Sequence, residues 1–211
     1  MNMTTKTLSA LAGLALVAGS ANAALITPDS VVASSFSGAS NQAINTINSS
    51  GLNAPGDETA THDTGNYWQG GQHNDTGTGD GVGTSITFDL GDVYNLTGTW
   101  IWNYNNGDSS LRGFTLFEIY VGGSTDPTAS TLIKGDALIS QNSIGVPNTA
   151  EYEAFAASNV QYVRFVSLGT GANQRVGLGE VRFDGTPVPE PGSLALLGLG
   201  GLLIGARRRR G

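Results

Sequence analysis

Apolar and polar residues alternate along much of the middle of this 211-residue chain. Residues 85–90 read Ser-Ile-Thr-Phe-Asp-Leu, which places three apolar side chains on one face and three polar ones on the other. This alternation is the pattern of a half-buried β-strand. Residues 95–104 are also β-rich, and Leu96, Trp100, Trp102 and Tyr104 share one parity. The pattern therefore predicts two strands in this region.

Shorter β-rich segments recur along the rest of the chain, at residues 31–36, 114–121, 131–133, 137–140, 151–155, 161–168 and 177–183. Gly, Asn, Asp or Pro stands in almost every gap, and these residues favour turns. No stretch of the body shows a helical period of useful length. Many short strands joined by turns predict an all-β sandwich. Residues 49–83 form one long polar, glycine-rich stretch, and loops of this length are often functional.

Charge narrows the classes of function. Residues 24–186 hold 16 acidic and 5 basic residues, which gives this body a net charge of −11. Nucleic-acid binding is excluded because phosphate contacts need clustered Lys and Arg. The charge suits a soluble extracellular protein, or one that binds divalent cations. There is no cysteine, so the core must hold the fold without disulfides, with or without a metal.

The N-terminus has the features of a secretory signal peptide. Lys6 supplies the positive region, residues 8–18 are apolar, and Ala21-Asn22-Ala23 is a small-x-small cleavage site. Signal peptidase is expected to cut after Ala23. The sequence therefore predicts three parts: a signal peptide at 1–23, one β-sandwich at 24–186 and a tail at 187–211.

The tail begins with Val-Pro-Glu-Pro-Gly, continues with an apolar run at 193–206, and is followed by Arg207–Arg210. As a helix the run would span about 21 Å, less than the ~30 Å of a bilayer core. The arginines would keep that end on the cytoplasmic side. This order resembles the PEP-CTERM tail of Gram-negative bacteria, with Pro189, Glu190 and Pro191 as the sorting motif. An ordinary buried helix is the alternative.

The PEP-CTERM resemblance implies a short C-terminal membrane helix and an exosortase-type membrane protease that processes the tail. The protein would then be anchored transiently in the inner membrane. Afterwards it would reach the cell surface or the extracellular matrix of a Gram-negative bacterium.

The body resembles a discoidin-type domain, also called galactose-binding-like or coagulation factor C-domain type. The segments that carry this resemblance are 33–35, 44–52, 86–91 (Ile-Thr-Phe-Asp-Leu-Gly), 101–105 (Ile-Trp-Asn-Tyr-Asn) with Arg112-Gly113, 162–165 and 177–183. It covers residues 26–185 and implies a jelly-roll β-sandwich. Two departures stand out: Asn48-Ser49 occupies the place of an Asp-Gly pair, and the insert at 53–83 is long.

The same resemblance implies a structural Ca²⁺ between the first loop and a glutamate near the last strand. Glu180 matches that glutamate, Asn48 matches the loop aspartate, and the carbonyls of Ser50 and Gly51 are neighbours. Calcium takes about six to eight oxygen ligands, which such a loop provides. The alternative is that Glu180 faces solvent and pairs with Arg164 or Arg182. A second loop, 75–81, lacks EF-hand spacing and reads as a turn-rich connection.

Ligands of this fold usually bind to loops at one end of the sandwich. Tyr67 and Trp68 are an aromatic pair in a polar context and could form a platform for a sugar ring. His73 and Arg112, with His62, could bond sugar hydroxyls. The alternative role for Trp68 is a plug that anchors its loop over the core. Trp100 and Trp102 share a face, and their simplest role is to belong to the core.

Features of an active site are few, and we expect no enzyme. Neither His62 nor His73 lies in a nucleophile elbow or an HExxH motif. Glu151 and Glu153 point the same way on a predicted strand and could pair as glycosidase carboxylates. Charges on an edge strand, however, commonly guard against aggregation.

The leading hypothesis is an exported, surface-sorted protein that binds carbohydrate without catalysis, in a biofilm's exopolysaccharide matrix. One alternative is a structural matrix or adhesion protein without a sugar pocket. The other is a polysaccharide hydrolase.

Overall fold

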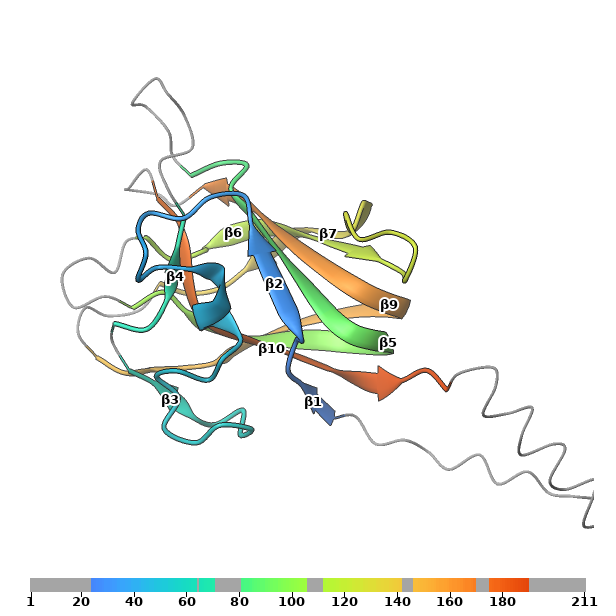
Figure 1. The fold of residues 1–211 in the computed structure, drawn as a ribbon, viewed down its shortest axis with the longest axis horizontal. Helices are drawn as coiled ribbons and strands as arrows, with labels where there is room; N and C mark the ends of the chain where they lie inside the picture. The colour runs from blue at the N-terminus through green and yellow to red at the C-terminus, as the bar shows by residue number, and fades with distance from the viewer. Residues whose placement is uncertain are drawn as a thin grey trace, which may run out of the picture.

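The computed structural model describes residues 24–63, 65–70, 81–105, 112–141, 146–169 and 175–189. Its elements, in chain order, are β1 (Ala24–Ile26), β2 (Ser30–Ala33), the 3-10 helix η1 (Ala43–Thr46), β3 (Thr61–His62), β4 (Trp68–Gln69), β5 (Ser85–Asn103), β6 (Leu116–Gly122), β7 (Thr131–Leu138), β8 (Asn148–Thr149), β9 (Glu151–Gly169) and β10 (Gly177–Pro187) (Figure 1). The described part of the chain is thus almost entirely strands and loops, and the all-β prediction is confirmed.

Eight strands form one antiparallel hydrogen-bonded sheet in the order β1-β10-β5-β9-β6-β7, with β2 beside β5 and β4 beside β10. The two longest strands, β5 and β9, run through both layers. The first part of β5 pairs with β2 and with the last part of β9. The second part of β5 pairs with β10 and with the first part of β9. The sandwich is therefore one sheet folded on itself.

Two residues with positive φ lie where β5 and β9 pass from one layer of the sandwich to the other. Gly91 has φ 80° and lies within a register shift between Asp89 and Tyr94, where β5 changes layer. Asn159 of β9 has φ 58°, and its N–H donates to Asn95 Oδ1 at 3.2 Å. Glycine and asparagine adopt this left-handed conformation at the lowest cost. The strands therefore bend without leaving the sheet.

The main core lies between the two layers. Phe183 of β10 contacts Phe88 of β5 and Phe165 of β9, with ring centroids 5.5 and 6.1 Å apart, and Phe88 and Phe165 are 5.4 Å apart. The three rings are fully buried. Because Phe183 belongs to one layer and the other two rings belong to the opposite layer, these contacts join the layers of the sandwich.

A second, smaller core lies on the outer face of the sheet, where Trp102 packs with Leu52 and Ala60. Trp102 is fully buried, and its Nε1–H donates to the Ala60 carbonyl at 2.7 Å. Trp102 was predicted to share a face with Leu96, but Leu96 lies in the main core. Register shifts near the middle of β5 reverse the parity between them. This second core fixes the loop that precedes β3 against the sheet.

The ends of the described body lie side by side, because Ala24 of β1 pairs with Gly185 of β10 (Figure 1). Among the described residues, no helix has the length and apolar character that a membrane span requires. The predicted signal peptide at 1–23 and the apolar run at 193–206 lie outside those residues. The domain boundaries at 24 and 186 remain predictions.

Candidate functional site

Trp68 lies in the core and offers no ring face to a ligand. Its exposed fraction is 0%, its Nε1–H donates to the Ser35 carbonyl at 3.0 Å, and its ring centroid lies 5.8 Å from that of Phe114. A sugar platform needs a ring that solvent can reach, so the platform role predicted for Trp68 is wrong. The alternative prediction, a plug that anchors its loop over the core, fits this environment.

The other residues predicted to bind a ligand do not form an open platform either. Tyr67 is only 9% exposed, and its ring lies 4.5 Å from that of Tyr104 at an interplanar angle of 60°. Arg112 is half-buried, and its Nε atom has no hydrogen-bond partner in the described part of the chain. His73 lies outside the described residues. A role of Arg112 in ligand binding stays a prediction.

The loops at this end of the sandwich are held together by buried amides. Asn103 Nδ2 donates to the carbonyls of Phe114 and Ser140, both at 2.8 Å, and its Oδ1 accepts the N–H of Tyr104 at 2.8 Å. A Cβ at Gly113 would come within 2.5 Å of Asn103 Oδ1, so the glycine leaves room for the amide. These bonds give the loop end a fixed scaffold.

A second amide connects further segments of the same loop end. Gln69 Nε2 donates to the Tyr104 hydroxyl at 2.9 Å, and Gln69 Oε1 accepts from Ser37 Oγ at 2.8 Å. Asn148 Nδ2 donates to the Asn103 carbonyl at 2.8 Å. Buried amides whose hydrogen bonds are made rigidify a loop cluster. Arg112 directly precedes Gly113 in the chain, and Gly113 lies against the Asn103 amide.

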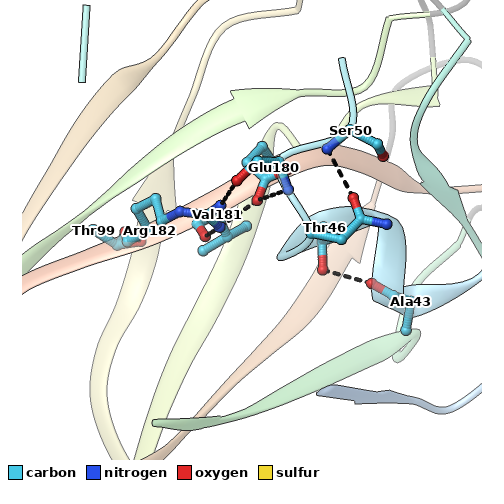
Figure 2. Close-up of polar contacts among 9 residues, drawn as sticks. Ala43, Thr46, Ser50, Thr99, Glu180, Val181 and Arg182 are labelled. Atoms are coloured by element: carbon cyan, nitrogen blue, oxygen red, sulfur yellow. Dashed lines mark hydrogen bonds and ion pairs between the residues drawn. The ribbon is translucent and has the colours of Figure 1, made fainter. Parts of the chain in front are cut away.

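The predicted metal residues do lie together. Glu180 is fully buried and forms an ion pair with Arg182, which is 1% exposed (Figure 2). The Ser49 N–H donates to Glu180 Oε1 at 3.4 Å, and Arg182 Nη2 donates to Ser49 Oγ at 2.7 Å. The alternative prediction named Arg182 as a possible partner of Glu180, and the ion pair confirms it. The same prediction placed Glu180 in solvent, which is wrong because Glu180 is fully buried.

The loop beside Glu180 has its own internal structure. Asn48 Oδ1 accepts the Ser50 N–H at 2.9 Å, and Figure 2 shows Glu180 between Arg182 and this loop. Gly51 has φ 94°, and a Cβ there would lie 3.0 Å from the His62 ring. Ser50 Oγ and Glu180 Oε2 are buried and have no hydrogen-bond partner among the described residues.

The donor set fits a divalent cation poorly. Two buried oxygens, on Ser50 and Glu180, are unpaired, which a cation could use. However, the carboxylate of Glu180 is already paired with a guanidinium, so Ca²⁺ would add two uncompensated charges in a buried place. No group of three His, Cys, Asp or Glu with metal-binding geometry occurs in the described ranges. Calcium stays a prediction.

Burial shifts the pKa values of both Glu180 and Arg182. It raises the pKa of Glu180 to about 7, and the Arg182 charge and the Ser49 N–H oppose that shift. Burial likewise lowers the pKa of Arg182, and Glu180 opposes this. Both shifts reflect the cost of charge away from water.

His62 packs beside the same loop. It is fully buried between Gly51 and Gly179, and neither ring nitrogen has a hydrogen-bond partner within the described ranges. Burial lowers the pKa of His62, and backbone groups and the charge of Asp63 oppose the shift. The ring is therefore neutral in the folded protein at neutral pH.

We expect His62 to make the wild type sensitive to acid. Its pKa is lower in the folded state than the ordinary 6.5, so below pH 6.5 the unfolded chain binds the additional proton. The contribution of His62 to stability is thus present above pH 6.5 and is lost as the pH falls. Urea unfolding at neutral and mildly acidic pH should show a larger loss for wild type than for His62→Gln. Glu180 titrates in both proteins, so its effect cancels; equal losses would contradict the prediction.

The two glutamates considered as a glycosidase pair have structural partners. Glu153 forms an ion pair with Lys134 of β7. Glu151 accepts the Ser140 N–H through both carboxylate oxygens, at 3.0 and 3.1 Å. Both carboxylates thus help to attach neighbouring segments to β9, and nothing in this arrangement favours catalysis.

Sequence reasoning named Arg182 only as one of two possible partners of a solvent-facing Glu180, and it did not place His62 beside this loop. The signal for Arg182 was available, because residues 180 and 182 lie two apart on a strand and so share a face. For His62 there was no comparable signal, since only the folded loop places it against Gly51 and Gly179.

Comparison with known proteins gives two findings. Residues 187–210 match the PEP-CTERM protein-sorting motif. A search of the curated proteins found no match.

Solved structures share the fold of the body. The carbohydrate-binding module 32 (CBM32) of AlyQ in complex with 4,5-unsaturated mannuronic acid is 25% identical, covering 75% of this chain and 96% of its own, with a TM-score of 0.52. An F5/8 type C domain from Bacteroides fragilis is 17% identical, and the match covers 79% of this chain and 99% of that domain, with a TM-score of 0.53. A fucolectin from striped bass serum is 16% identical, and the match covers 76% of this chain and 46% of the fucolectin, with a TM-score of 0.51.

These findings confirm the two resemblances seen in the sequence and the predicted sandwich class. The sorting motif implies export and surface sorting, with processing by an exosortase and a C-terminal membrane tail. The chain thus joins a β-sandwich with the fold of CBM32 and F5/8 type C (discoidin-like) domains to a PEP-CTERM protein-sorting motif at its C-terminal end.

Proposed function

We propose that this protein is an exported, surface-sorted carbohydrate-binding protein without catalytic activity, associated with the exopolysaccharide matrix. The observation that carries the proposal is the joint presence of a sorting motif and a sandwich similar to the CBM32 of AlyQ, whose complex contains 4,5-unsaturated mannuronic acid. Signal peptidase and an exosortase-type protease are the proposed processing partners. The inner-membrane anchor is proposed to be transient.

Charge favours a neutral glycan over an acidic one. Residues 24–186 carry a net charge of −11, so a negatively charged polyuronate would be repelled at low ionic strength. Arg112 lies beside the rigid loop end and is our candidate for bonding a sugar hydroxyl. Its planar guanidinium suits several directed hydrogen bonds.

The test is binding of the full-length protein, kept in detergent, to neutral and acidic polysaccharides by calorimetry. We expect binding to a neutral glycan, and Arg112→Ala should weaken it about tenfold or more, as expected when a charged hydrogen bond is lost. Arg164→Ala is the matched control, because Arg164 stacks on Tyr120, with its guanidinium carbon 4.7 Å from the ring centroid, in the sheet. Binding of no glycan would overturn the proposal.

A second function is favoured by the burial of Trp68 and Tyr67, which leaves the predicted aromatic platform closed. In that case the protein is a structural matrix or adhesion component without a sugar pocket. Absence of glycan binding together with retained association with the cell surface would support this second function.

A further inference from the structure

We infer that the guanidinium of Arg182 supplies the positive charge that the buried Glu180 carboxylate requires. It thereby joins strand β10 to the loop 48–51, the role that a divalent metal ion would otherwise have. The inference does not depend on the proposed function. It concerns how a chain without cysteine holds a long loop against its sheet.

Both charges of the ion pair are buried. Glu180 and Arg182 are 0% and 1% exposed and form an ion pair. An isolated buried charge is very unfavourable, so each group supplies the compensation that the other requires. The pair is neutral as a unit, and a divalent cation would disturb that balance.

Both members of the ion pair contact the loop through Ser49. Arg182 Nη2 donates to Ser49 Oγ at 2.7 Å, and the Ser49 N–H donates to Glu180 Oε1 at 3.4 Å. Ser49 is therefore held at two atoms by two residues that are more than 130 positions away in sequence. A metal ion bound by a carboxylate and by loop oxygens would form the same kind of link.

The backbone of the loop is held in an unfavourable conformation at Ser49. Ser49 has φ 61°, a left-handed conformation that costs a residue with a side chain free energy unless its surroundings hold it. The bonds from Glu180 and Arg182 supply that support. Arg182 is held in turn, since its Nη1 donates to the Val181 carbonyl at 2.8 Å and its own carbonyl accepts from Thr99 Oγ1 at 2.9 Å.

The experiment is thermal unfolding of the full-length protein in detergent, in millimolar CaCl₂ and in excess EDTA. We expect the wild-type Tm to be the same in both. Arg182→Met should lower the Tm by about 10 °C, because it leaves a buried carboxylate unpaired. Calcium should then raise the Tm of this variant, since Glu180 and the unpaired Ser50 Oγ can coordinate it.

Two further variants separate the ion pair from general damage. Glu180→Gln combined with Arg182→Met should lower the Tm by less than the sum of the single changes, because no charge is left unpaired. Arg164→Met, outside the site, should lower the Tm equally in CaCl₂ and EDTA.

Three results would overturn the inference: a wild-type Tm that falls in EDTA, an Arg182→Met variant that ignores calcium, or additive effects in the double variant. If Arg182→Met does not fold, calorimetric titration of the wild type with CaCl₂ decides, because binding there overturns the inference and no binding supports it.

Discussion

Trp68→Ala is expected to lower the free energy of unfolding by about 3–5 kcal/mol, the usual cost of truncating a buried tryptophan. The indole fills a fully buried position next to Phe114, and its Nε1–H binds the Ser35 carbonyl. Alanine would leave a cavity under the loop end and would remove the hydrogen bond from the indole to Ser35. Urea unfolding followed by circular dichroism measures the change.

Trp68→Phe is the matched control. It keeps most of the apolar volume but removes the hydrogen bond to Ser35, so we expect part of the loss, with about 1 kcal/mol from the hydrogen bond. Glycan binding by the folded fraction should persist in both variants. A Trp68→Ala protein that is as stable as wild type but no longer binds glycan would return Trp68 to the role of a sugar platform.

Replacement of Pro189, Glu190 and Pro191 by alanine is expected to abolish processing of the tail and to leave the protein in the inner membrane. The replaced residues stand at the start of the sorting motif at 187–210. Proline disfavours helical backbone whereas alanine favours it, so the replacement changes the conformational preference of the motif. Immunoblots of membrane, surface and medium fractions measure the outcome.

Val188→Ala is the control for this prediction, because it changes the same segment while it keeps both prolines and Glu190. Its distribution should match that of the wild type. If the triple variant is processed and sorted normally, the proposed role of these three residues is wrong. Pro189 is exposed, and Glu190 and Pro191 lie outside the residues that the structure describes.

The two predictions concern parts of the chain that act separately. Trp68 supports the end of the sandwich where the loops meet. The motif begins at the last residue of β10, beyond the point where Gly185 pairs with Ala24 of β1. Loss of sorting should therefore leave the free energy of unfolding of the sandwich unchanged.

The strand content and part of the core could be predicted from local sequence patterns. The alternation at 85–90 gave Ile86, Phe88 and Leu90 as buried residues, and all three are in the main core. Alternation is a local property, because successive side chains of a strand point to opposite faces. The sorting tail was also readable, since it depends on the order of residues and not on a fold.

The way the strands join and the burial of polar residues depend on contacts between distant segments and could not be predicted from local patterns. Gly91 and Asn159 read as turns between separate strands, but neighbouring strands carry the hydrogen bonding across them, so β5 and β9 are continuous. Burial of Trp68 depends on Ser35 and Phe114, which are distant in sequence. The link from Ser49 to Glu180 and Arg182 exists only because folding brings residues more than 130 positions apart into contact. A local pattern shows which residues share a strand face, so it could name Arg182 as a partner of Glu180. It carries no information about the depth of burial of the pair or about its contacts with Ser49.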